Sequence, residues 1–359
     1  MKTTIAAAAL SLLALPAFAS ADDVAPLSLD SAVKLTAYFD DDGTFVKPNG
    51  GADRHYTAGA ALSLQWRAPW VDSIVGAIPS FNDEFATQTP NTSFAMGFIA
   101  SLNMFTPEDL DNPNPILNDH PYAGWTYGGL ILQRANRDPQ LARFEHLELD
   151  IGVTGPASQT DAAQKWIHLS FNATTPEGWN HQIREEVGVN FKYQRRYRWE
   201  PLPLPKDSSP WLPRFEVLPE AGFTLGTINV DANAGAVLRL GWNLPDDFGP
   251  GRIALPADFT RPTAHSSGDL FQDNWLYFYG RPNARAIAHD TTLQGSLFNN
   301  SPVEVTPEPV VGEVELGIAL QLFRHFQLTY SQTFRSKEFT DQNAPDSFGS
   351  LTASFIVIW

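Results

Sequence analysis

The sequence predicts an all-β protein, a transmembrane antiparallel β-barrel of about twelve strands. Segments 33–39, 60–66 and 144–151 alternate apolar residues with small or polar ones, which is the pattern of strands with one apolar face. The chain also ends on an aromatic residue, Trp359, after the apolar segment 351–358. No uninterrupted apolar stretch reaches the length of about 18 residues that a membrane-spanning helix needs. These observations favour membrane crossing by strands.

The first residues indicate export. Lys2 is followed by an apolar run over 5–15 and by two small-x-small sites, at 17–19 and 19–21, as in a secretory signal peptide. The run is too short to span a bilayer. We therefore expect residues 1–21 to be a signal peptide and residues 22–359 to form one outer-membrane barrel domain. Because the exported chain has no cysteine, closed strand pairing would replace disulfides in holding it together.

Composition excludes one class of partner. The chain carries 24 Lys and Arg against 40 Asp and Glu, a formal net charge of −16, and nucleic-acid binding depends on basic surface. Ten Trp, nine Tyr and 24 Phe suit the aromatic girdles of a membrane barrel. Composition alone leaves a soluble β-protein with an aromatic core open.

Twelve segments have roughly the 9 to 11 residues, or somewhat more, that a tilted membrane strand needs. The predicted strands are 32–41, 56–67, 92–106, 122–135, 143–154, 179–197, 214–226, 232–243, 274–290, 308–323, 326–337 and 347–359. An even number puts both termini on the periplasmic side. The same parity puts the long connections 68–91 and 244–273 there too, although periplasmic turns of barrels are usually short.

One segment, near 158–170, reads as a short helix between strands. Gly155 and Pro156 end the preceding strand, and Ser158 with Asp161 three residues later forms a capping-box-like start. Asp161, Gln164 and His168 stand at i, i+3 and i+7, so one helix face would carry a carboxylate, an amide and an imidazole. Strand parity places this helix on the extracellular rim, together with segments 40–42, 53–57 and 119–125.

Several motifs, in order along nearly all of the mature chain, resemble the outer-membrane lipid A 3′-O-deacylases, the LpxR family. The matching motifs are Asp53-Arg54-His55-Tyr56-Thr57-Ala58-Gly59, Asn118-Asp119-His120-Pro121-Tyr122-Ala123-Gly124-Trp125, Gly155-Pro156 with Gln164-Lys165-Trp166-Ile167-His168, Gly178-Trp179-Asn180-His181-Gln182 and Arg335-Ser336-Lys337-Glu338-Phe339. The resemblance implies a twelve-stranded barrel, an active site between the outer rim and a loop helix, and calcium-dependent hydrolysis of the 3′ ester of lipid A.

The resemblance also assigns roles to residues. It implies that His168 is the general base, that Gln164 precedes it by one helical turn, and that Thr57 is the threonine of the second-strand motif. Asp40 and Asp41 stand where the family has an Asn-Asp pair, so the asparagine is replaced. Some members carry a glutamate six residues after the histidine, where this chain has Thr174, and that role does not transfer.

The chemistry is consistent with these assignments. Ester hydrolysis needs a water molecule deprotonated near neutral pH, which suits an imidazole, and charge compensation at the carbonyl oxygen, which suits a bound cation. Asp41, with Asp40 assisting, would bind Ca²⁺. Because successive strand residues point to opposite faces, at most one of the two carboxylates projects inward unless the strand is broken.

Other interpretations remain at this point. Without the resemblance, His168 would more often be a surface or packing residue, and an acidic triplet before Gly43 would be a solvated turn. The whole protein could be a channel or structural barrel without chemistry, or a calcium-dependent outer-membrane phospholipase with a Ser and His pair. No Gly-x-Ser-x-Gly sequence occurs, so a serine elbow is unsupported. A monomer is expected, since a closed barrel has no exposed edge.

Overall fold

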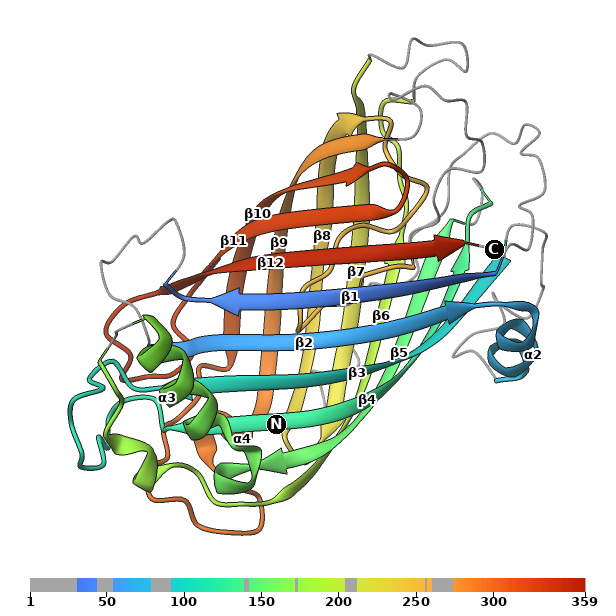
Figure 1. Ribbon diagram of the computed structural model, residues 1–359. Coiled ribbons are helices and arrows are strands. Elements are labelled where there is room, and N and C mark those ends of the chain that lie inside the picture. The colour runs from blue at the N-terminus through green and yellow to red at the C-terminus, as the bar shows by residue number, and fades with distance from the viewer. Residues whose placement is uncertain are drawn as a thin grey trace, which may run out of the picture.

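The computed structural model describes residues 31–43, 54–78, 92–138, 142–171, 174–203, 212–255, 257–259 and 274–358. The predicted signal peptide at 1–21 and the predicted domain start at residue 22 lie outside these ranges. Twelve antiparallel strands form one closed barrel, in which β1 (Ala32–Asp41) pairs with β12 (Asp346–Ile358) and so joins the two ends of the sheet. The predicted fold class is confirmed (Figure 1).

Each strand pairs with its neighbours in the sequence, so the connections are simple hairpins. The remaining strands are β2 (His55–Arg67), β3 (Thr92–Thr106), β4 (Ala123–Asn136), β5 (Arg143–Thr154), β6 (Val187–Tyr197), β7 (Arg214–Gly226), β8 (Asn229–Trp242), β9 (Trp275–Asp290), β10 (Val310–Leu322) and β11 (Phe326–Arg335). The predicted ranges agree closely, with one exception. The strand predicted for 179–197 begins only at Val187, because the 3₁₀ helix η3 (Gly178–His181) and an irregular segment precede it.

Side chains alternate between an apolar outer face and a polar lumen. Along β1, Leu35 and Phe39 are exposed on the outside, whereas Lys34, Thr36 and Asp40 are buried. Exposed apolar side chains continue around the wall at Leu62, Phe98, Ile151, Leu240, Phe278, Leu316 and Phe355. This arrangement is the reverse of a soluble protein and is the one that a barrel in lipid requires.

Ion pairs between adjacent strands fill much of the lumen. Arg196 Nε lies 2.7 Å from Glu220 Oε2, and Arg281 Nη1 lies 3.0 Å from Glu315 Oε2. All four side chains are buried. A buried charge without a partner is strongly destabilising, so these pairs hold neighbouring strands in one arrangement.

Part of the long β8–β9 connection enters the lumen. Residues 245–255 and 257–259, hereafter the lumen segment, bury Phe248 and Phe259 completely. Side chains of four strands, β1, β6, β9 and β12, donate hydrogen bonds to its backbone carbonyl oxygens. These bonds run from Lys34 to Asp258 (3.3 Å), Arg196 to Phe248 (3.0 Å), Arg281 to Pro250 (2.5 Å) and Thr352 to Gly251 (3.3 Å). The connection between β8 and β9 is longer than a usual periplasmic turn because part of it fills the lumen.

The two rims of the barrel differ. The rim at which β1 begins and β12 ends carries α2 (Pro69–Ala77). The opposite rim, hereafter the α3 rim, carries η2 (Gly155–Ser158), α3 (Thr160–Phe171), η3 and α4 (Thr291–Gln294) (Figure 1). No helix in the described part of the chain is long and apolar enough to cross a membrane.

Candidate active site

Helix α3 lies on the outer face of the barrel wall, over β3 and β4 at the α3 rim (Figure 1). Its Ala163 and Ile167 pack with Ala58 of β2, Met104 of β3 and Trp179 of η3. Met104 stands between two residues that face the lumen, so this cluster is on the outside. The helix therefore covers a strip of wall that elsewhere is exposed and apolar.

The start of α3 is anchored by a close approach to β4. A Cβ atom at Gly124 would lie 2.0 Å from Thr160 Oγ1 and 2.2 Å from Ser158 Oγ, so only glycine fits. Thr126 Oγ1 donates to the carbonyl oxygen of Ser158 at 2.8 Å. The predicted capping box is wrong. Ser158 belongs to η2 and donates to the Gly155 carbonyl at 2.6 Å, and α3 begins at Thr160.

Two of the three residues predicted to share a helix face are buried against the wall. Gln164 is 1% exposed and His168 is 4% exposed. Asp161 lies at the edge of this face, where its carboxylate pairs with Lys165 at 3.7 Å and stays partly exposed. Asp161 and Lys165 are four residues apart and so lie next to each other on the helix. The Asp161 carboxylate therefore belongs to the solvent side of α3 and not to the side packed on the wall.

A main-chain carbonyl orients the ring of His168. Its Nδ1 makes a short hydrogen bond with the backbone carbonyl oxygen of Thr174. Because a carbonyl oxygen only accepts, Nδ1 must carry the proton, and Nε2 is the basic nitrogen of the neutral ring.

Gln164 is held by one end. Trp179 Nε1 donates to Gln164 Oε1 at 2.7 Å. That bond fixes the amide orientation and turns Nε2 away from the indole. Among the described residues Nε2 is a buried donor without a hydrogen-bond partner. A buried unpaired donor is costly, and in a candidate site it indicates a ligand atom that arrives later.

Thr57 is the extra residue of a β-bulge between β2 and β3. The register shifts between Tyr56 and Ala58, which gives Thr57 a direction that a regular strand would not. Its Oγ1 lies 2.7 Å from Thr106 Oγ1, and the amide of Asp42 donates to its carbonyl oxygen at 3.1 Å. The bulge thus links the end of β3 to the end of β1.

The two adjacent carboxylates at the end of β1 lie on opposite faces of the wall. Asp40 is buried in the lumen and accepts a hydrogen bond from the Tyr56 hydroxyl at 2.9 Å. Asp41 is in register with Ala58, a member of the cluster beneath α3, and accepts from the Gly43 amide at 2.6 Å. Asp41 therefore lies on the outer face of the wall, which α3 with Gln164 and His168 also covers, whereas Asp40 faces the lumen.

Comparison with known proteins decides the family. The sequence profile described as "Outer membrane protein LpxR" matches residues 5–357. The chain belongs to the LpxR family. Membership supports the expected role as an outer-membrane lipid A deacylase. A search of curated proteins found no match.

One of the similar solved structures supports the fold. LpxR from Salmonella typhimurium is similar with a TM-score of 0.67 at 17% identity, over 90% of this chain and 99% of that one. The β domain of the Bordetella autotransporter BrkA has a TM-score of 0.40 at 10% identity, covering 90% and 98% of the two chains. The transport unit of AIDA-I from Escherichia coli has a TM-score of 0.40 at 9% identity, covering 98% and 95%.

Resemblance to the LpxR family implies a calcium ion, and the donors near Asp41 suit one. Asp41 supplies a carboxylate, and Thr57 and Thr106 supply hydroxyls, all of them the hard oxygen ligands that Ca²⁺ prefers. Within the described residues no three His, Cys, Asp or Glu side chains are arranged so that they could hold a metal ion by themselves. An ion at this LpxR site would therefore need main-chain or substrate oxygens in addition to Asp41.

A second cluster stiffens the α3 rim of this LpxR-family barrel. His55 lies between two carboxylates, with Nδ1 2.5 Å from Asp346 Oδ2 and Nε2 3.1 Å from Asp119 Oδ1. Burial would raise the pKa of Asp119, but the hydrogen bond and charge of His55 and the backbone amides of Glu108 and His120 together outweigh burial and hold this pKa below its ordinary value. Burial, and then the neighbouring His55, lower the pKa of His120, whose ring stacks on Phe105.

Sequence reasoning missed two groups that position the site residues. The indole of Trp179 and the carbonyl of Thr174 orient Gln164 and His168. Trp179 stands in one of the motifs shared with the LpxR family, so it could have been singled out. A main-chain carbonyl leaves no mark in a sequence.

Proposed function

We propose that the protein is an outer-membrane esterase that removes the 3′-linked acyloxyacyl group from lipid A by Ca²⁺-assisted hydrolysis. The observation that carries the proposal is the burial of His168 and Gln164 between α3 and the outer wall of an apolar-surfaced barrel. A site in this position is reached from the lipid phase and not through an aqueous lumen. Its substrate is therefore an amphiphile with acyl chains in the membrane and a polar part at the rim.

His168 acts as the general base. With the Nδ1 proton engaged by the Thr174 carbonyl, Nε2 takes a proton from the water molecule that attacks the ester carbonyl carbon. The imidazolium then returns this proton to the alkoxide oxygen of the leaving sugar hydroxyl, and the second product is the free acyloxyacyl acid. The ring ends neutral, ready for another turnover.

Gln164 stabilises the charge that forms on the ester carbonyl oxygen. Its Oε1 is held by Trp179, so Nε2 is preorganised as a donor and is without a partner in the described structure. Donors fixed before the reaction lower the barrier without reorganisation at the moment of bond formation.

Asp41 and Thr57 hold the cation and the rim end of the substrate. The opposite directions of the two adjacent carboxylates support Asp41 as the ligand and leave Asp40 to the lumen. When bound, Ca²⁺ supplies positive charge that offsets negative charge on the reacting ester. Thr57 offers a hydroxyl beside it, oriented by the bulge and by Thr106.

The alternative functions fit the structure less well. The lumen segment is hydrogen-bonded to β1, β6, β9 and β12, so it obstructs a diffusion path. In a serine hydrolase triad, the Nδ1 of the histidine faces a carboxylate, whereas that of His168 faces a carbonyl. We further infer that the α3 rim faces the outside of the cell, since the start of β1 and the end of β12 both lie at the other rim. We also infer that the barrel acts as a monomer.

The purified barrel in a zwitterionic detergent with Ca²⁺ tests this proposal. It would be mixed separately with lipid A and with a diacyl phospholipid, and the products would be analysed by mass spectrometry. We expect lipid A to lose one acyloxyacyl group from the 3′ position while the phospholipid stays intact. Hydrolysis of the phospholipid, or cleavage of neither, would contradict it.

A further inference from the structure

A second cavity lies inside the lumen, separated by the barrel wall from the site beneath α3. It has a volume of about 160 Å³. Residues 252–255 of the lumen segment form one side, and residues next to the α3 rim, such as Asn229 and Thr292, form another. It is thus a pocket between the obstruction in the lumen and the α3 rim.

One wall of this pocket is aromatic. Trp125 and Tyr127 project from β4 into the lumen, and their rings stack with centroids 5.4 Å apart. Both are buried and belong to a cluster with Ile228 and Ile253. The pair offers a flat, rigid surface on which a ring with C–H groups can pack.

The rest of the lining is polar but electrically balanced. The lining contains four Lys or Arg side chains and four Asp or Glu side chains. Several of these side chains are already paired with one another, as Arg252 is with Glu313 at 2.5 Å and Arg335 with Glu313 at 2.7 Å. A strongly charged ligand would have to break these pairs, so the lining favours a neutral one.

Asparagine amides supply the unused hydrogen-bonding capacity. Five of them line the pocket, namely Asn103, Asn190, Asn229, Asn233 and Asn283. Asn283 is 7% exposed, and neither its Oδ1 nor its Nδ2 has a partner among the described residues. Asn233 Oδ1 is also buried and unpartnered there.

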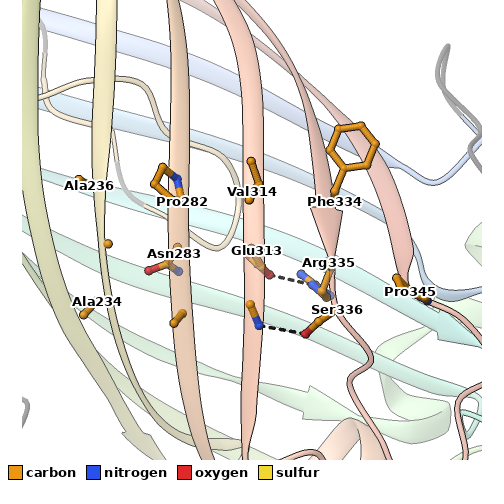
Figure 2. A pocket seen from close by; sticks show the side chains of 13 residues that line it. Ala234, Ala236, Pro282, Asn283, Glu313, Val314, Phe334, Arg335, Ser336 and Pro345 are labelled. Carbon is orange, nitrogen blue, oxygen red and sulfur yellow. Dashed lines mark hydrogen bonds and ion pairs between the residues drawn. The ribbon is translucent and has the colours of Figure 1, made fainter.

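The neighbours of Asn283 explain why it stays unpaired. On β10 it is in register with Glu313, whose two oxygens are taken by Arg252 and Arg335. On β8 it faces Gly235, which has no side chain. Figure 2, which draws another pocket on the same strands, shows Asn283 beside the Glu313–Arg335 pair. Burying an unpaired amide costs free energy, which a ligand in the pocket would offset.

We propose that this pocket binds one neutral sugar residue. A sugar presents adjacent hydroxyls that each donate and accept, which matches the paired donor and acceptor of an amide. Its apolar ring face matches the Trp125 and Tyr127 wall. The volume holds about ten water molecules at roughly 15 Å³ each, which is about the size of a single hexose. The proposal does not depend on the esterase activity.

The test uses the full barrel in lauryldimethylamine oxide, because a detergent with a sugar headgroup would compete. Glucose, galactose and N-acetylglucosamine are titrated at millimolar concentrations, with saturation-transfer NMR and tryptophan fluorescence as readouts. A second arm uses the oligosaccharide freed from lipopolysaccharide by mild acid, and so distinguishes a free sugar from a lipopolysaccharide sugar. We expect saturable binding of at least one probe.

Variants locate the binding. Asn283→Ala and Asn233→Ala remove unpaired amide groups, so both barrels should fold normally, yet each should weaken binding about tenfold or more. Asn299→Ala, in the exposed segment after α4, should bind like the wild type. Lipid A deacylation should be unchanged in all three. Absence of saturable binding, or unweakened binding in folded Asn283→Ala and Asn233→Ala barrels, would overturn the proposal and leave the amides to water.

Discussion

The two sides of the same wall use buried polar groups differently. In the lumen, arginines and carboxylates are matched in ion pairs such as Arg196–Glu220. Beneath α3, Trp179 holds Gln164 through Oε1, and Gln164 Nε2 has no partner among the described residues. Matched pairs stabilise one arrangement, whereas half-satisfied groups are ready for a substrate. The comparison predicts that substitutions of the paired lumen charges change stability and that substitutions beneath α3 change rate.

The largest effect is expected from Arg239→Met in the lumen. Arg239 Nη2 lies 2.6 Å from Glu216 Oε2, and Nη1 also pairs with Asp247. Removing the cation leaves two buried carboxylates uncompensated and should destabilise the barrel by about 3–5 kcal/mol. The midpoint of heat-modifiable gel migration measures this, with Lys337→Met at the exposed rim as control. An Arg239→Met barrel that lost activity while keeping the stability of the wild type would contradict the comparison.

On the outer side, His168→Ala should lower the deacylation rate by on the order of 10²-fold or more without changing heat-modifiable migration. His168→Gln should do little better, because an amide cannot serve as the base. The matched control is His325→Ala, whose Nδ1 also bonds a backbone carbonyl, that of Ile356, but at the other rim. A folded His168→Ala barrel with near-normal rate would remove the assignment.

The adjacent carboxylates test the two sides within one strand. We expect a chelator to abolish activity and Ca²⁺ to restore it better than Mg²⁺, because irregular oxygen ligands suit the larger ion. Asp41→Ala should cost more activity than Asp40→Ala, since Asp40 faces the lumen. Initial rates over a Ca²⁺ titration measure both. Full activity in excess chelator, or the reverse order of the two variants, would contradict the metal assignment.

A smaller effect is expected from Trp179→Phe. The substitution keeps an aromatic ring but removes the donor that orients Gln164. A lost hydrogen bond of about 0.5–1.5 kcal/mol corresponds to a rate decrease of up to about tenfold. Trp166→Phe, on the exposed side of α3, is the control and should act like the wild type. Equal rates for both variants would show that Gln164 needs no such support.

The smallest effect concerns pH. The lowered pKa of His120 means that the folded barrel resists protonation there, so stability should fall as pH drops below about 6.5, the ordinary pKa of histidine. The lowered pKa of Asp119 adds stability that is present above about pH 4 and is lost as pH falls further. The temperature midpoint of heat-modifiable gel migration, measured at several pH values, tests this. In Asp119→Asn the midpoint should depend less on pH. A barrel more stable in acid would contradict both signs.

Much of the fold could be predicted because barrel strands are a local property. Alternation alone indicates where β1 and β12 run, and it indicates that Asp40 and Asp41 cannot both point inward. Periodicity also predicts α3, but not its start, because Gly124 on a distant strand decides where the chain can approach. A side-chain cap such as the one predicted at Ser158 decides the start of a helix less strongly than this close contact between backbone and side chains.

The lumen could not be predicted. The segment around Phe248 has no periodicity, and its hydrogen-bond partners lie up to 224 residues away in sequence, as with Lys34 and Asp258. Sequence reasoning named the polar side chains that α3 carries, but not the groups that position them. Thr174 contributes a carbonyl, and Thr57 owes its direction to a bulge, and neither depends on a readable residue pattern.

Lipid A extracted from cells that produce the wild-type barrel, the His168→Ala barrel or neither tests the central claim most directly. Equal outer-membrane amounts of the two barrels are confirmed first. Mass spectrometry should find lipid A lacking the 3′-linked acyloxyacyl group only with the wild type. Intact lipid A in the wild-type cells under Ca²⁺-replete conditions, or equal cleavage by the His168→Ala barrel, would contradict a hydrolytic site between α3 and the outer wall.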